Sequence, residues 1–252
     1  MALAALLAGC GSAAETVSTS GEPSSNVVTG EEAPASPGGQ ESDAAETTTE
    51  VPAESEAKLE VADQGFTQLD GGEYGSPEVT FGVVITNSGN AMATDARLQI
   101  AFKDDSGAVV DTAEEYLTVV LPGSSVAVGS SIYDVDGVTD MTVQLMPGST
   151  EALEDEPANF EVVDVNTRQS EFGLTTTATV KSPFTRDLED LQAVAIYRDG
   201  SGAVIGGAFT FINFVPAGGE GAVSIDAMYE GLEPAATDVY IGISALTLLA
   251  DS

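Results

Sequence analysis

Residues 97–110 read RLQIAFKDDSGAVV, and this stretch decides the fold class. Leu98, Ile100 and Phe102 fall on one face, and Arg97, Gln99 and Lys103 fall on the other, which is the period-2 pattern of a β-strand with one buried face. The DDSG that follows predicts a tight turn, because Asp favours turns and Gly107 can adopt positive φ without steric cost. The apolar residues after the turn begin a return strand. The stretch therefore predicts a β-hairpin.

A similar sequence recurs about 95 residues later. Residues 192–205 read QAVAIYRDGSGAVI, and they align on residues 97–110 without a gap. Upstream, VVIT at residues 83–86 matches ATVK at residues 178–181. Repetition at such a period indicates tandem copies of one structural unit. Each copy has about 90 residues, enough for one modest core, and its short apolar runs predict a β-sandwich.

The amino-acid composition indicates where the folded part of the chain begins. No aromatic residue occurs between Gly11 and Gln64, where Ser, Thr, Glu, Ala, Pro and Gly dominate. Such a segment buries too little apolar surface to offset a backbone ordering cost of about 1 to 2 kcal/mol per residue, so residues 10–64 are predicted to be a disordered acidic linker. The predicted fold is all-β, with tandem immunoglobulin-like β-sandwich domains at residues 65–148 and 158–252.

The charge balance narrows the range of functions. The chain has 7 Lys and Arg against 41 Asp and Glu, a formal net charge of -34, and no histidine. We expect no nucleic-acid partner, because such a chain repels phosphates. With no histidine and one cysteine, it lacks the usual zinc, haem and iron–sulfur ligands and the base of a Ser-His-Asp triad. We expect no enzyme and no cofactor, with carboxylate chemistry and hard-cation binding left open. The acidity suits either a high-salt habitat or an ordinary exported protein.

A short apolar segment precedes the only cysteine of the chain, Cys10. It is too short to span a bilayer, so residues 1–9 are predicted to be an export signal peptide. The run Leu7-Ala8-Gly9-Cys10 resembles the lipobox of prokaryotic lipoproteins. The resemblance implies acylation of Cys10 and an extracytoplasmic protein held to the membrane by lipid. No Lys or Arg precedes the cysteine, which leaves open a start codon upstream of the printed sequence.

Both copies resemble the FxLYD family of bacterial surface modules, over most of residues 65–250. The resemblance rests on ITNSGN at 85–90 and VKSPFTRDLED at 180–190, and on FKDDSG at 102–107 and YRDGSG at 197–202. It implies two immunoglobulin-like sandwiches exposed on a cell surface. It brings no catalytic residues and no agreed ligand.

Three carboxylates, Asp134, Asp136 and Asp140, surround Gly137 and make a candidate Ca²⁺ site. Calcium takes six to eight oxygen ligands, and acids at alternate positions can supply several of them. The segment is shorter than a twelve-residue calcium loop and has no Glu at its end, so an ordinary turn is the alternative. Other acids, near Asp104 and near Asp187, leave glycosidase-type chemistry as a further alternative, although Asp is also favoured at turns.

Val194 and Ile196 form a candidate interface. They align with Gln99 and Ala101, so a strand face that is polar in the first copy is apolar in the second. A strand that is apolar on both faces needs cover. A different edge arrangement or a loop of the second sandwich would supply it, and so would the first domain or a partner protein.

Phe209 and Phe211 lie in the nearby run FTFINF and share one strand face. They are candidates for the same interface, with packing in the core of the second sandwich as the alternative.

These observations favour a non-enzymatic surface lipoprotein that displays two β-sandwich modules for binding, adhesion or envelope assembly. Its expected partners are the membrane, through the lipid anchor, and an unknown protein or envelope polymer. The alternatives are a solute-binding lipoprotein associated with a transporter and a calcium-stabilised surface module. A transporter-associated protein usually has two α/β lobes, and no βαβ alternation occurs in this sequence.

Overall fold

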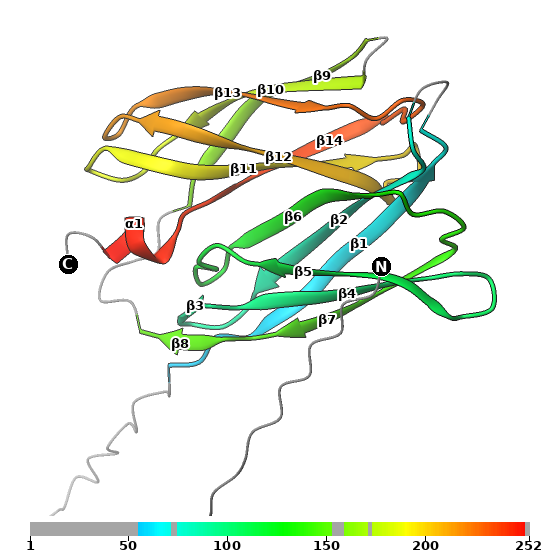
Figure 1. The fold of residues 1–252 in the computed structure, drawn as a ribbon. Helices are drawn as coiled ribbons and strands as arrows, with labels where there is room; N and C mark the ends of the chain where they lie inside the picture. Colours follow the sequence, from blue (N-terminus) through cyan, green and yellow to red (C-terminus); the bar gives the residue numbers. More distant parts are fainter. Residues whose placement is uncertain (1–54, 72–74, 153–158, 171–172, 250–252) are drawn as a thin grey trace, which may run out of the picture. The chain divides into compact units, whose positions relative to one another are not determined.

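The computed structural model describes residues 55–71, 75–152, 159–170 and 173–249, and these belong to one compact unit. It consists of antiparallel strands and one short helix, α1 (Ala245–Leu249) (Figure 1). The predicted all-β class is confirmed. No helix in the described ranges has the length and apolar character needed to cross a membrane.

The first sandwich packs the sheet β1-β2-β6 against the sheet β5-β4-β7. A two-stranded pair, β3-β8, adjoins it. Its strands are β1 (Leu59–Leu69), β2 (Glu78–Asn87), β3 (Met92–Thr94), β4 (Arg97–Lys103), β5 (Val109–Tyr116), β6 (Ser125–Tyr133), β7 (Asp140–Met146) and β8 (Ser149–Glu151).

The second sandwich repeats this topology, with the sheet β9-β10-β13 packed against the sheet β12-β11-β14. Its strands are β9 (Glu161–Ser170), β10 (Gly173–Lys181), β11 (Leu188–Arg198), β12 (Val204–Val215), β13 (Glu220–Ala227) and β14 (Ala236–Gly242). The irregularities recur too, since both the β4/β5 pair and the β11/β12 pair shift register just before the hairpin turn. The two copies inferred from the sequence thus form equivalent sandwiches.

The two hairpin turns that carry the sequence alignment have the same hydrogen bonds. In the first, Asp104 Oδ1 accepts from the N–H (2.9 Å) and the hydroxyl (2.7 Å) of Ser106. In the second, Asp199 Oδ1 accepts from the N–H (2.8 Å) and the hydroxyl (2.7 Å) of Ser201. The serine hydroxyl is the main reason that the pKa of each aspartate is lowered. These aspartates therefore stabilise the turns, which is a common role of Asp.

The predicted domain boundaries need correction at both ends of the first sandwich. Strand β1 begins at Leu59, so residues 59–64 belong to the sandwich and not to the linker. Leu59 and Val61 pack against its core, but polar neighbours give the segment the composition of a linker. At the other end, Ser149–Glu151 pairs with β3 and lies beyond the predicted limit at residue 148. The rest of the predicted linker, up to residue 54, lies outside the described residues.

Each sandwich has its own apolar core, and the two cores differ at one equivalent pair of positions. In the first, Phe81 and Phe102 are fully buried with ring centroids 5.4 Å apart. In the second, Thr176 and Tyr197 occupy these positions, also fully buried. The second core therefore contains hydroxyl groups where the first contains only aromatic rings.

These hydroxyl groups are only partly hydrogen-bonded. Thr167 Oγ1 lies 2.9 Å from Thr176 Oγ1 and 2.7 Å from Thr237 Oγ1. The buried hydroxyl of Tyr197 has no hydrogen-bond partner in the described structure. Burial raises the pKa of Tyr197 to about 12. An unpaired buried hydroxyl reduces the free energy of unfolding, because it has lost its bonds to water.

Tyr197→Phe is therefore expected to stabilise the protein. Removing the unpaired hydroxyl should raise the free energy of unfolding by about 1 kcal/mol and the Tm by about 2 to 4 °C. The matched reverse change, Phe102→Tyr, should lower the free energy of unfolding by about 1 to 3 kcal/mol. Denaturant unfolding of both variants measures these changes. A less stable Tyr197→Phe variant would mean that this hydroxyl is hydrogen-bonded in solution.

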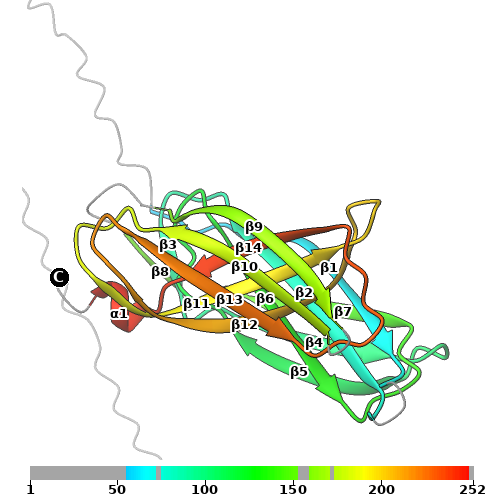
Figure 2. The same ribbon diagram turned by 90° about the horizontal axis from the view of Figure 1, so that it is seen from above.

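The two sandwiches stack through sheets that are not equivalent. The outer face of β1-β2-β6 lies against the outer face of β12-β11-β14, so that four sheets form successive layers (Figure 1). Figure 2 looks down on the outermost β9-β10-β13 sheet. Strands β2 and β11 lie in the two inner sheets and are buried over most of their length. The junction between the sandwiches is therefore a third buried layer, in addition to their two cores.

Candidate functional site: the junction between the two sandwiches

A small apolar cluster lies at the centre of the junction. Val84 of β2 and Ala127 of β6 meet Val194, Ile196 and Val204 of the second sandwich. Val194 is 2% exposed and Ile196 is fully buried. The structure thus places these two candidate interface residues against the first sandwich. From the sequence, the first domain was one of the surfaces that could cover them.

Glycines let the two sheets approach closely. A Cβ atom on Gly129 would lie 2.7 Å from the backbone nitrogen of Ala208. A Cβ atom on Gly207 would lie 2.6 Å from the Cα of Gly129. Contacts below 3.0 Å are too short for a real Cβ atom, and in both cases the obstacle is backbone that cannot move aside easily. Only glycine fits at these two positions without separating the sheets.

Hydrogen bonds cross the junction beside the glycines. The N–H of Gly207 donates to Thr80 Oγ1 over 3.2 Å, at a fully buried position. The hydroxyl of Thr67 donates to the carbonyl oxygen of Ile205 over 2.6 Å. These bonds satisfy polar groups that would otherwise be buried unpaired, so they fix the register between the sheets as well as the distance.

Arg198 makes ion pairs with two acids at the edge of the junction. Its guanidinium group binds Asp63 of the first sandwich and Asp238 of the second. It also donates to the carbonyl oxygen of Gly202 over 2.8 Å. The hydrogen bonds to Asp63 and then to Asp238 raise the pKa of Arg198 further above its ordinary value. One of the chain's seven basic residues thus links the two sandwiches.

The candidate residues Phe209 and Phe211 are not covered. Their side chains are 45% and 59% exposed, and the two rings contact each other edge-to-face with centroids 5.8 Å apart. The alternative that they pack in the core of the second sandwich is wrong for both, and their role in an interface stays a prediction.

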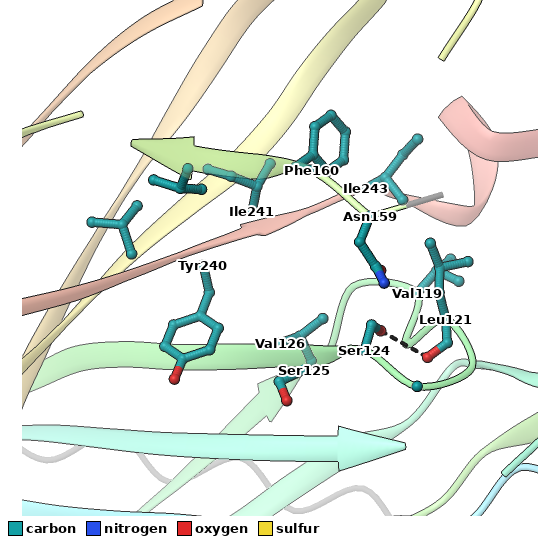
Figure 3. A pocket seen from close by; sticks show the side chains of 13 residues that line it. Val119, Leu121, Ser124, Ser125, Val126, Asn159, Phe160, Tyr240, Ile241 and Ile243 are labelled. Atoms are coloured by element: carbon teal, nitrogen blue, oxygen red, sulfur yellow. Dashed lines mark hydrogen bonds between the residues drawn. The ribbon is translucent and has the colours of Figure 1, made fainter. Parts of the chain in front are cut away.

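A pocket of about 290 Å³ opens at the junction (Figure 3). Its walls come from the segment before β6 and the start of β6, the start of β9, and β14 with the residues after it. They are largely aliphatic and aromatic, and the side chains labelled in Figure 3 are Val119, Leu121, Ser124, Ser125, Val126, Asn159, Phe160, Tyr240, Ile241 and Ile243.

The polar groups of this pocket are mostly engaged in local bonds. Ser124 Oγ donates to the carbonyl oxygen of Leu121 over 2.7 Å (Figure 3), and Ser125 Oγ lies 2.9 Å from Thr86 Oγ1. Burial, followed by the charge of Asp238, raises the pKa of Tyr240, which keeps its hydroxyl neutral. Among the described residues, no charged side chain lines the pocket. Its described walls therefore combine apolar side chains with neutral polar groups.

The structure does not bring Asp134, Asp136 and Asp140 together as a Ca²⁺ site. No group of three or more acidic, histidine or cysteine side chains is arranged to hold a metal in the described part of the chain. Asp136 Oδ1 accepts from the N–H of the adjacent Gly137 over 2.7 Å, and Asp140 Oδ2 lies 3.8 Å from Lys103 Nζ. Each of these two carboxylates is thus engaged locally.

Gln68 binds two backbone groups of this loop. Gln68 Nε2 donates to the carbonyl oxygen of Val135 over 3.0 Å, and the N–H of Val138 donates to Gln68 Oε1 over 3.0 Å. Both valines are buried in the first core. Gln68 therefore holds the loop in a fixed conformation, which is the alternative that the sequence offered.

The candidate lipidation site, Cys10 with Leu7, Ala8 and Gly9, lies outside the described residues. Its assignment rests on the sequence alone.

Sequence reasoning missed the junction glycines, and a signal for them exists in the repeat. Gly207 aligns with Thr112 of the first copy, which is exposed. Gly129 corresponds through the strand registers to Ser224, on the free face of the second copy. Loss of side chains on one face of only one copy indicates close contact at that face.

A comparison with protein-family models finds no match to the chain, and a comparison with curated proteins finds none either. The expected membership of the FxLYD family stays a prediction.

Proposed function

We propose that this protein is a non-enzymatic surface lipoprotein, anchored through acylated Cys10, which displays the paired sandwiches as one binding unit. The observation that carries the proposal is the run Leu7-Ala8-Gly9-Cys10 after a short apolar segment. Two acyl chains at about 0.8 kcal/mol per buried methylene make a stable anchor. The long polar segment that follows then separates the sandwiches from the membrane.

The stacking of the sandwiches supports a role in display and binding. Contacts between neighbouring domains of one chain are usually small and polar, so the domains are expected to change their relative orientation. Here the glycine contacts, the Thr80 bond and the Arg198 ion pairs hold the two sheets in one register. A ligand or partner that contacts both sandwiches therefore meets a preorganised surface, which lowers the entropic cost of binding.

The alternatives receive less support. A transporter-associated solute-binding protein usually has two α/β lobes around its ligand, whereas the described residues form two β-sandwiches packed across an apolar cluster. A calcium-stabilised module requires the loop at residues 134–140, which is held by Gln68 instead.

Cys10→Ser is expected to abolish membrane attachment. Without the thiol no acyl chain can be added, so the protein should move almost completely from the detergent phase to the aqueous phase. Detergent partitioning of cells that express each form from the full upstream reading frame measures this. Ser12→Ala, two residues further on, is a matched control that should remain in the detergent phase. Equal retention of the Cys10→Ser and parent proteins would refute the anchor.

A further inference from the structure

A second pocket, of about 330 Å³, lies at another edge of the junction and contains an unusual carboxylate. Glu78, the first residue of β2, is only 6% exposed, and its Oε2 atom is buried with no hydrogen-bond partner. Burial raises the pKa of Glu78 above its ordinary value. A buried carboxylate without a partner is costly, and a bound group that donates to it is one way in which a native structure compensates for this cost.

The other side chains of this pocket come from both sandwiches. Tyr133 at the end of β6 is 64% exposed, and Met228 and Glu230 follow β13 in the second sandwich. The pocket thus combines two carboxylates with an accessible aromatic ring and a thioether. None of the ion pairs among the described residues includes Glu78 or Glu230, so the negative charge is not neutralised from within.

We propose that Glu78, Glu230, Tyr133 and Met228 form a binding site for a small organic ammonium ion, the chemistry of a lysine side chain or of a free aliphatic diamine. The ammonium group donates hydrogen bonds to the carboxyl groups of Glu78 and Glu230, both of which line the pocket. The face of Tyr133 attracts the same cation, and Met228 contacts its methylene groups.

A bare metal ion fits the pocket less well. Calcium takes six to eight oxygen ligands, and the described residues of this pocket include two carboxylates. The apolar surface of Tyr133 and Met228 provides no oxygen ligand for a metal ion, whereas it can pack against the carbon chain of an alkylammonium ion. The composition of the pocket therefore selects an organic cation.

Titration of the full chain by two-dimensional NMR tests the site. We use putrescine and Nα-acetyl-lysine methylamide as probes, with Nα-acetyl-norleucine methylamide as the neutral analogue and CaCl₂ as the metal. Both amines should give saturable shifts of the Met228 and Tyr133 backbone signals, and the neutral analogue should give none. Tighter binding of putrescine would identify a free diamine as the natural class, and equal or tighter binding of the lysine probe would identify a lysine side chain.

Glu78→Gln should weaken amine binding at least tenfold, because it removes the charge-assisted bond of the buried carboxylate. Glu189→Gln, at an exposed position of β11, is the matched control and should bind as the parent does. Thermal unfolding checks whether both variants are folded. If Glu78→Gln does not fold, Tyr133→Ala provides an independent variant at an exposed position. Absence of saturable amine binding, equal binding by Glu78→Gln, or saturation by calcium without amine binding would each overturn the proposal.

Discussion

Val194→Lys is expected to lower the free energy of unfolding of the intact chain by about 4 kcal/mol and the Tm by about 10 °C. Val194 is 2% exposed and packs against Val84 and Ala127 in the junction. A lysine there would bring an ammonium group between two apolar sheets, where none of the clustered residues is a carboxylate. It would also remove the packing of the valine methyl groups.

The repeat supplies a matched control for this variant. Gln99 occupies the equivalent position on β4, on the outer face of the first sandwich, and its side chain is exposed. Gln99→Lys should change the free energy of unfolding by about 0.5 kcal/mol or less, as most surface changes do. Denaturant unfolding of the two variants gives the comparison. Equal effects at the two positions would show that the junction does not cover Val194 in solution.

The strands and the duplication were predictable from the sequence because both have local signals. Alternation at Leu98, Ile100 and Phe102 specifies a half-buried strand without reference to the rest of the chain. The Asp-x-Ser-Gly turn then recurs in the second copy with the same internal hydrogen bonds. Topology followed from the duplication, since equivalent sequences form equivalent sandwiches.

The way in which the two sandwiches pair was only partly predictable. The apolar face at Val194 and Ile196 indicated that cover was needed, but periodicity does not say which surface supplies it. Apart from Val84, the first sandwich contributes mostly Gly, Thr and Ala to this contact, as at Thr80, Gly129 and Ala127, so its own face has only a weak apolar signal. A close contact between backbones is visible only when the two copies are compared position by position.

Acidic residues misled the search for sites for a physical reason. Asp136 and Asp104 accept hydrogen bonds from neighbouring backbone N–H groups, and acids used locally in turns have the same residue types as a metal loop. Glu78, the first residue of β2, does not lie in such a turn. It shares a pocket with Met228 and Glu230 of the other sandwich, which no local pattern encodes.

Gly207→Leu is expected to disrupt the junction more than a substitution that removes the charge of Arg198 at its edge. The first added atom would lie 2.6 Å from the Cα of Gly129 and 3.0 Å from the carbonyl oxygen of Ala195, so the sheets must separate. Separation exposes the Val84/Val194 cluster and breaks the bond from Gly207 to Thr80. We expect a loss of about 3 kcal/mol or more in the free energy of unfolding.

Two matched controls isolate the contact from the conformational effect of replacing a glycine. Thr112 is the equivalent position in the first copy, on an exposed face, and Thr112→Leu should be nearly neutral. Gly200 lies in the turn before β12, where an added Cβ meets no atom within 4 Å, so Gly200→Leu should cost only a few tenths of a kcal/mol. Hydrogen exchange should show faster exchange in β2 and β12 of the Gly207→Leu variant, because these two strands line the junction, with β4 little changed. Unaltered exchange in β2 would mean that the two sandwiches are not stacked through this face, since a side chain at residue 207 would then have free space around it.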